Sequence, residues 1–156
     1  DELLFVARLT ESGMSIPETD RIEQHKKMFE LSDKLVSELK ESDIIIISTP
    51  IYNFGPPATL KAWSDLAARV KSTFKYSADG KQIGLLENKK VYLVITSGGT
   101  KIDSEQDFLT PWLKHVLNFF GIKDIQTIYA DQMSIDYDDS IKKAEKQIEN
   151  IVDQID

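Results

Sequence analysis

Four consecutive isoleucines, Ile44 to Ile47, restrict the fold of this chain more than any other feature of its sequence. Asp43 precedes them, and Ser48 and Thr49 follow, so the apolar run is short and has polar ends. β-Branched side chains favour extended backbone, and an apolar run without polar alternation is typical of a strand buried on both faces. Strands of that kind belong to parallel sheets. We therefore expect a buried parallel strand at residues 44–49.

The rest of the chain fits an α/β fold. Two more buried strands are predicted, at residues 91–97 and 125–130. Helical spacing of apolar residues predicts four helices, at residues 18–40, 58–70, 104–120 and 138–155. The polar, turn-rich segment 71–90 is expected to connect a helix to a strand. Alternating helices and strands imply right-handed crossovers and helices on both faces of a parallel sheet, in one domain over residues 1–156.

Charge and composition exclude several classes of function. The 156 residues include 19 Lys and Arg against 26 Asp and Glu, a net charge of −7, which argues against nucleic acid or an anionic membrane as partner. The lack of Cys excludes disulfides and a Cys nucleophile, and it suits a reducing, cytoplasmic location. His25 and His115 are too isolated for a metal site, and the acids Asp136, Asp138 and Asp139 suit a helix N-terminus.

Two loops follow predicted strands at the edge where ligands of open α/β sheets bind. In the first, Pro50–Pro57, prolines and a glycine restrict the backbone while Tyr52 and Phe54 are placed near the sheet edge. A planar heterocycle would pack on these rings, although the rings could equally cover the core. In the second, the paired Gly98 and Gly99 let N–H groups approach a partial negative charge, although such a pair also forms plain turns.

These loops and several flanking segments resemble the FMN-dependent NADH-azoreductases of the flavodoxin-like NAD(P)H:quinone reductase superfamily, whose members were also once labelled acyl carrier protein phosphodiesterases. The Tyr-Asn-Phe sequence at residues 52–54 is the most specific marker. The remaining matches run in the family's order through almost the whole chain: Pro57–Trp63 with Asp65, Thr73–Tyr76, Gly84–Leu86, Ile95–Gly99 and Phe119–Ile122.

The resemblance implies a flavodoxin-like three-layer sandwich and a homodimer that binds FMN at its interface. NADH would reduce FMN and leave, and a quinone or azo compound would then take two electrons, without a protein acid or base. The carried-over flavin contacts are Ile51, Tyr52, Asn53, Phe54, Ser97, Gly98, Gly99 and Thr100. Tyr76 and Phe120 are expected as apolar walls for a flat substrate, with ordinary packing as the alternative.

Two departures from the family pattern are expected to matter. The family's first strand, with the serine-rich loop that holds the FMN phosphate at a helix N-terminus, has no counterpart after Asp1. That strand would neighbour residues 44–47 in the 2-1-3-4-5 strand order, so we expect a βα portion to be missing here and one edge of strand 44–49 to be open. The second departure is Gly98, which stands where many relatives have Arg.

Other functions remain possible from the sequence. A flavodoxin-type electron carrier would bind FMN without reacting with NADH, and a non-catalytic dimerising module would bind no flavin. Hydrolysis has no support, because neither a G-x-S-x-G motif nor a metal cluster is present in the sequence.

Overall fold

A three-stranded parallel sheet forms the centre of the structure, a computed structural model that describes residues 22–153. Its strands are β1 (Ile44–Pro50), β4 (Lys90–Thr96) and β5 (Asp124–Ala130), in the spatial order β1-β4-β5. The strands run in register, with Pro50 opposite Thr96 and Thr96 opposite Ala130. All three carboxyl ends therefore meet at one edge of the sheet, as the sequence predicts.

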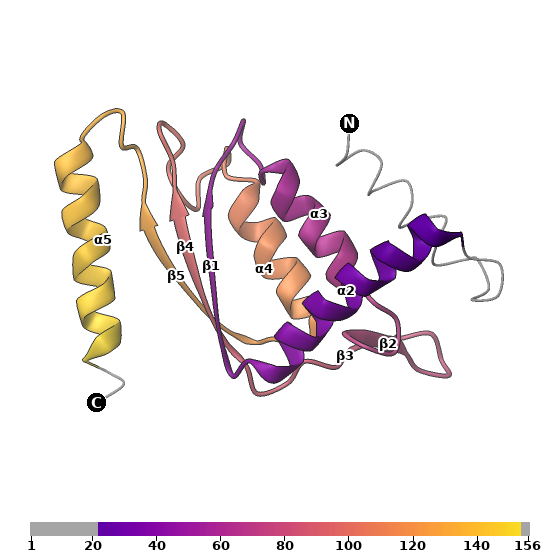
Figure 1. The fold of residues 1–156 in the computed structure, drawn as a ribbon. Coiled ribbons are helices and arrows are strands. Elements are labelled where there is room, and N and C mark those ends of the chain that lie inside the picture. The colour runs from indigo at the N-terminus through magenta and orange to yellow at the C-terminus, as the bar shows by residue number, and fades with distance from the viewer. Residues whose placement is uncertain (1–21, 154–156) are drawn as a thin grey trace.

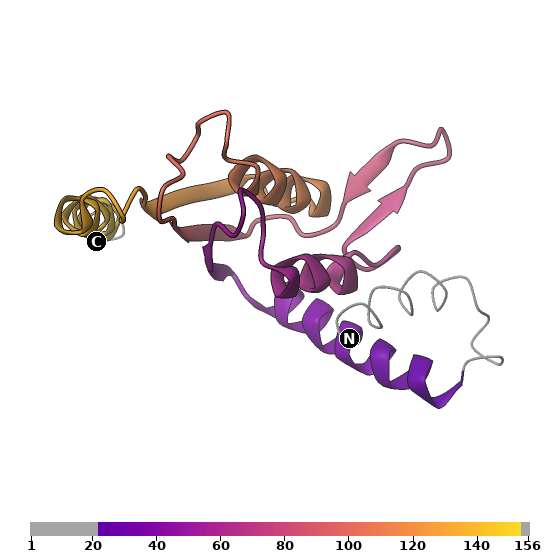
Figure 2. The same cartoon turned by 90° about the horizontal axis from the view of Figure 1, so that it is seen from above.

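Helices cover the sheet on both sides, which confirms the predicted α/β class. Figures 1 and 2 show α3 and α4 on one face, with α2 outside α3, and α5 on the other face. The helices are α2 (Glu23–Glu41), α3 (Ala58–Ala67), α4 (Leu109–Phe120) and α5 (Tyr137–Val152). The core lies between α4 and the sheet, where Leu93, Ile95, Leu113 and Leu117 are completely buried.

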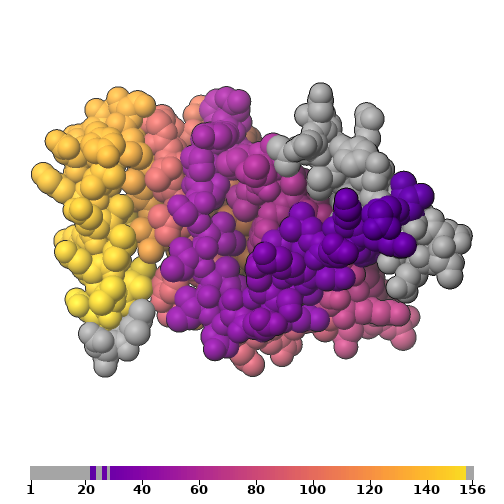
Figure 3. All heavy atoms as spheres, in the orientation of Figure 1, coloured from indigo at the N-terminus to yellow at the C-terminus, as the bar shows by residue number. Residues whose placement is uncertain are grey.

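Strand β1 departs from the expected burial on both faces. Ile45 and Ile47 pack towards the core, whereas Ile44 and Ile46 are 57% and 68% exposed. The reason is that α5 packs on β5 and no described element covers this face or the free edge of β1. A groove of about 460 Å³ runs between β1 and α2, and Figure 3 shows this part of the surface hollowed. The expected open edge is thus present in the part of the chain that the structure describes.

Two helix boundaries, in α3 and α4, differ from the predicted ones. The predicted start of the first helix, residues 18–21, lies outside the described residues. Helix α3 ends at Ala67, three residues early, because the Thr73 hydroxyl donates to the Ala67 carbonyl at 2.7 Å and turns the chain away. Helix α4 begins at Leu109 rather than near 104, because the buried Asp107 carboxylate accepts the Thr110 N–H at 2.9 Å.

Two other helix ends agree better with the sequence. Gly121 ends α4 in the left-handed region with φ 106°, where a residue without Cβ is favoured. Asp136 accepts the Asp139 N–H at 3.0 Å and so caps α5, as expected for this acidic run.

The turn-rich segment contains a hairpin that was not predicted. Strands β2 (Phe74–Tyr76) and β3 (Gln82–Gly84) pair antiparallel and project from the body at the end where the parallel strands begin (Figure 1). Gly84 lies against Gly121 so closely that a Cβ on Gly84 would stand 2.2 Å from the Gly121 nitrogen. This contact fixes the hairpin to the C-terminal end of α4.

Candidate functional site

The loops after β1 and β4 leave the sheet side by side. The Ile51 N–H donates to the Thr96 carbonyl at 2.8 Å, directly after the last paired residues of the two strands. Ile51 itself is 9% exposed and belongs to the core, so its side chain anchors the first loop. The two segments singled out in the sequence are therefore brought together at the carboxyl edge of the sheet.

A tight turn follows Ile51. Tyr52 and Gly55 exchange two backbone hydrogen bonds of 3.0 Å, and the residues between them, Asn53 and Phe54, have φ values of 46° and 71°. A left-handed backbone costs about 1–2 kcal/mol for a residue with a Cβ, and it is rare for a bulky side chain such as Phe54. Strain of this kind is found mostly where function requires a particular backbone.

The strained turn exposes its aromatic rings. Tyr52 is 62% exposed and Phe54 is 49% exposed, so the alternative that these rings cover the core is wrong. The N–H groups of Asn53 and Phe54 have no acceptor among the described residues. The loop therefore offers two exposed rings and two donors without a partner among the described residues.

Phe108 is a further candidate residue beside these loops, and it was not predicted from the sequence. Its N–H donates to the Phe54 carbonyl at 2.9 Å, and its ring is 62% exposed beside the start of α4. A signal was present, since an aromatic residue precedes the helix after the capping residue Asp107. The predicted helix start near 104 placed Phe108 inside the helix, so its position beside the first loop was not predicted.

The carbonyl and N–H groups of the second loop differ in their hydrogen bonding. The Ser97 side chain is 4% exposed, and its hydroxyl donates to the Thr100 carbonyl. The Ser97 and Gly98 carbonyls accept N–H groups of the loop after β5. The N–H groups of Gly98, Gly99 and Thr100, by contrast, have no acceptor within the described part of the chain. The loop thus leaves three donors unpaired among the described residues, a suitable environment for an electron-rich ligand edge.

Tyr76 and Phe120 are not brought to these loops. Tyr76 lies on the projecting hairpin at the opposite end of the sheet, where its ring is 58% exposed (Figure 1). Phe120 is 1% exposed in the core, and its carbonyl accepts the Leu86 N–H at 2.8 Å. The interpretation of Phe120 as a substrate wall is therefore wrong in this structure, since no face of the ring is free. Ordinary packing, the alternative, is the role it has.

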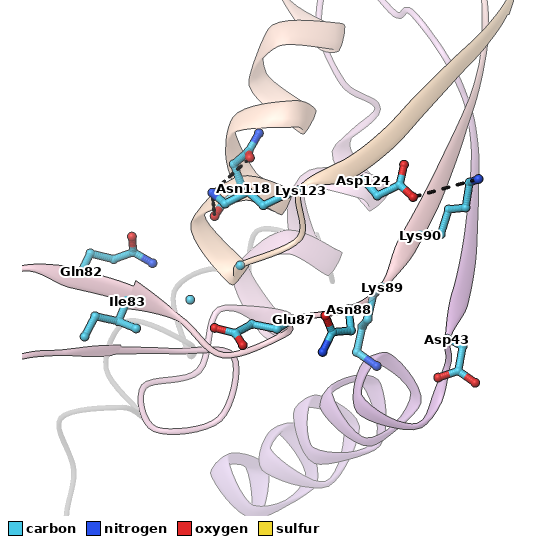
Figure 4. Close-up of a pocket in the computed structure, with 12 residues that line it drawn as sticks. Asp43, Gln82, Ile83, Glu87, Asn88, Lys89, Lys90, Asn118, Lys123 and Asp124 are labelled. Carbon is cyan, nitrogen blue, oxygen red and sulfur yellow. Dashed lines mark hydrogen bonds and ion pairs between the residues drawn. The ribbon is translucent and has the colours of Figure 1, made fainter.

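A pocket of about 750 Å³ lies at the other end of the sheet, where the strands begin (Figure 4). It is lined by equal numbers of acidic and basic side chains, and several of these interact with the protein itself. Lys123 contacts the Asn118 side chain at 3.2 Å, and Lys90 lies 4.0 Å from Asp124. Its balanced charge favours no ligand class.

Two other kinds of feature are absent from residues 22–153. No group of three or more His, Asp or Glu side chains there could hold a metal ion. None of the described helices is both long and apolar enough to cross a membrane.

Comparison with known proteins assigns the family. The family model described as "Flavodoxin-like fold" matches residues 1–154. The chain belongs to this family. It is also 71% identical over 152 residues to the FMN-dependent NADH:quinone oxidoreductase of Pelagibacter ubique (strain HTCC1062), covering 97% of this chain and 79% of that protein. A relative of the same name in Jannaschia sp. (strain CCS1) is 44% identical, over 85% of this chain and 69% of its own.

Solved structures support the flavodoxin-like fold independently. The FMN-dependent NADH-azoreductase from Bacillus anthracis str. Ames Ancestor, in complex with FMN, superposes with a TM-score of 0.77. The match is 23% identical and covers 99% of this chain and 74% of that one. A second Bacillus anthracis azoreductase, from strain Sterne, gives a TM-score of 0.74 over 93% of this chain and 70% of its own.

Proposed function

We propose that this flavodoxin-like protein is an FMN-dependent NADH:quinone oxidoreductase that also accepts azo compounds. The observation that carries the proposal is the pair of adjacent loops at the carboxyl edge of the sheet, with exposed aromatic rings and free N–H donors. The names of the relatives give FMN, NADH and a quinone, and the name of the FMN-bound azoreductase structure gives an azo acceptor. The proposed reaction is two-electron transfer from NADH through FMN to a quinone or azo acceptor. A cytoplasmic location is part of the proposal and fits the absence of Cys.

The residues present fit the isoalloxazine ring of FMN. Tyr52 and Phe54 are exposed aromatic side chains on which a planar ring can pack, and the free N–H groups of Gly98–Thr100 suit the polar edge of that ring. Bound FMN supplies the redox chemistry by accepting a hydride equivalent and passing two electrons on. The chain's own contribution is orientation and hydrogen bonds, which favour the negative charge of the reduced ring. Ile51 contributes through its buried side chain, by anchoring the loop.

Gly98 leaves more room at this edge than a larger residue would. A Cβ at residue 98 would stand 3.1 Å from the Ser134 hydroxyl oxygen, and one at Gly99 would meet nothing within 4 Å. With Gly98 in the position of the Arg that resembling sequences carry, backbone N–H groups are the donors that this loop presents to a ligand.

A second copy of the chain completes the proposed site. Tyr76 lies at the opposite end of the sheet from the flavin loops, so it reaches a flavin only from another protomer. The projecting hairpin, with Tyr76 and Ile83 exposed, suits such a contribution across a homodimer interface. In this arrangement Tyr76 of one protomer forms a wall against which a flat acceptor stacks on the flavin of its partner.

Anaerobic rapid mixing tests the proposed reaction. Protein loaded with FMN is mixed with NADH, and loss of the oxidised-flavin absorbance is followed before a quinone is added. We expect reduction by NADH and reoxidation by the quinone, each complete in one phase of two electrons per flavin. Flavin that stays oxidised with NADH but is reduced by dithionite would instead indicate an electron carrier. Failure to take up FMN would indicate a dimerising module.

A further inference from the structure

The loop after β5 comprises Asp131–Ser134, and we call it the support loop. Over its own whole length it lies against the loop after β4. Three backbone N–H groups of this support loop reach the neighbouring loop. Gln132 donates to the Ser97 hydroxyl at 3.3 Å, Met133 to the Ser97 carbonyl at 3.1 Å, and Ser134 to the Gly98 carbonyl at 2.9 Å. The support loop thus engages acceptors at the start of the Ser97–Thr100 loop.

The far end of the loop after β4 is held by the side chain of Asp131. The Asp131 carboxylate accepts the Ile102 N–H at 2.8 Å through Oδ2, across 29 positions in the sequence. Ile102 is 5% exposed and packs in the core, so this bond fixes the point at which the loop returns to the body. Asp131 is fixed in turn, because its own carbonyl accepts the Ser140 hydroxyl of α5 at 2.6 Å.

These bonds explain why the loop leaves more donors than acceptors free. Protein groups use the carbonyls of Ser97, Gly98 and Thr100, so Gly99 has the one carbonyl of these four residues without a partner in the described part of the chain. The N–H groups of Gly98–Thr100, by contrast, are all without an acceptor among the described residues. A loop free to rotate its peptide groups would turn some carbonyls towards the ligand, where they would repel the electron-rich edge of a flavin. Preorganised donors avoid that cost at the moment of binding.

We propose that Asp131 is a positioning residue that holds the Gly98–Thr100 loop in its flavin-binding form. It touches neither flavin nor substrate and acts through the Ile102 backbone. The flavin part of this inference rests on the proposed function, whereas the support of the loop stands on the hydrogen bonds alone. Hydrogen bonds to a charged acceptor are among the stronger ones, so losing this one should be measurable.

Amide hydrogen exchange of the unsubstituted protein gives the first test. Without FMN we expect slow exchange at Ile102 and fast exchange at Gly98–Thr100, and on adding FMN the latter become slow. Fast exchange at Ile102 without FMN would overturn the proposed support. Slow exchange at Ile102 with no effect of FMN at Gly98–Thr100 would overturn the proposed function, and with it the flavin role of Asp131.

Substitution of Asp131 gives the second test. Asp131→Ala should raise the exchange rate of Ile102 in the flavin-free protein and weaken FMN binding, each about tenfold, the effect of losing one charge-assisted hydrogen bond. Asp131→Asn keeps an oxygen acceptor and should bind FMN within about threefold of the unsubstituted protein. Asp138→Ala removes a nearby exposed carboxylate and should change neither quantity.

The outcomes separate positioning from a general loss of stability. FMN affinity that is unchanged in Asp131→Ala, while Ile102 exchanges faster, would overturn the inference. Equal losses of affinity in Asp131→Ala and Asp138→Ala would also overturn it, because a lost charge rather than a lost acceptor would then be responsible.

Discussion

The Phe108 N–H donates a 2.9 Å hydrogen bond to the carbonyl oxygen of Phe54. This bond joins the start of α4 to the strained turn after β1, and it places two exposed aromatic rings on neighbouring loops. Phe54 keeps a φ of 71° although it is not glycine. The backbone of the turn is therefore held by its surroundings, and the exposed ring remains available to a ligand.

Two substitutions of Phe54 separate strain from ligand binding. Phe54→Gly and Phe54→Ala both remove the ring, so both should weaken FMN binding to a similar extent. Glycine adopts a positive φ without the penalty that a Cβ brings, so Phe54→Gly should be more stable to unfolding by about 1 kcal/mol than Phe54→Ala. Urea denaturation of the flavin-free variants measures the difference. Equal stabilities would contradict a strained turn.

Two glycine substitutions should affect different properties, one FMN binding and the other the stability of the fold. Gly99→Ala adds a Cβ into open space and should leave the free energy of unfolding unchanged, while weakening FMN binding about tenfold because the methyl group enters the ligand's position. Gly84→Ala forces a Cβ to 2.2 Å from the Gly121 nitrogen and should destabilise the fold by about 3 kcal/mol. Denaturation and flavin titration of each variant check both values. A Gly99→Ala variant with normal affinity would place the flavin elsewhere.

Tyr76 tests the contribution of a second protomer. Tyr76→Ala should raise the KM for a quinone about fivefold, the effect of losing one aromatic contact, and leave FMN affinity and NADH reduction unchanged. Tyr76→Phe keeps the ring and should behave as the unsubstituted protein does. If Tyr76→Ala weakens FMN binding instead, the hairpin contributes to the fold of the flavin loops and not to the acceptor site.

The turn of the hairpin should show an acid-dependent interaction. The side chain of Lys81, hydrogen-bonded to Asp79 at 2.7 Å, and that of Ser77 lower the pKa of Asp79 from its ordinary value of 3.8. A lowered pKa in the folded protein stabilises it above pH 3.8, and this stabilisation is lost as the pH falls through the folded-state value. NMR titration of the Asp79 carboxyl carbon should give a midpoint below 3.8. In Lys81→Ala the midpoint should move up, and an unmoved midpoint would exclude Lys81 as the cause.

Local patterns in the sequence predicted the parts of the fold that depend on neighbouring residues. The isoleucine run at 44–47 predicted a parallel strand, and Gly121 predicted the end of α4, because backbone preference and periodicity act within a few residues. The exposure of Ile44 and Ile46 was not predictable in the same way, since it depends on which elements cover β1. The hairpin was missed although Asp79-Gly80, a dipeptide that often marks turns, lies in the loop between its strands.

The meeting of the two candidate loops was predicted because the residues of each are adjacent in sequence, whereas contacts between residues distant in sequence were missed. Tyr52–Phe54 and Ser97–Thr100 each follow a recognisable strand, so strand order alone brings them to one edge. Phe108 and Asp131 act through hydrogen bonds across 54 and 29 positions, respectively, and no local pattern reports such a pairing. Phe120 was assigned from a motif, but its position on the inner face of α4 makes it a core residue.

A fluorescence titration of FMN with the protein tests the central claim, that the loops after β1 and β4 bind a flavin. We expect quenching that saturates at one FMN per chain in the unsubstituted protein and a markedly weaker effect in Gly99→Ala. The Pelagibacter ubique relative, measured in parallel, serves as the positive control. Quenching by the relative but none by this protein under the same conditions would contradict the claim.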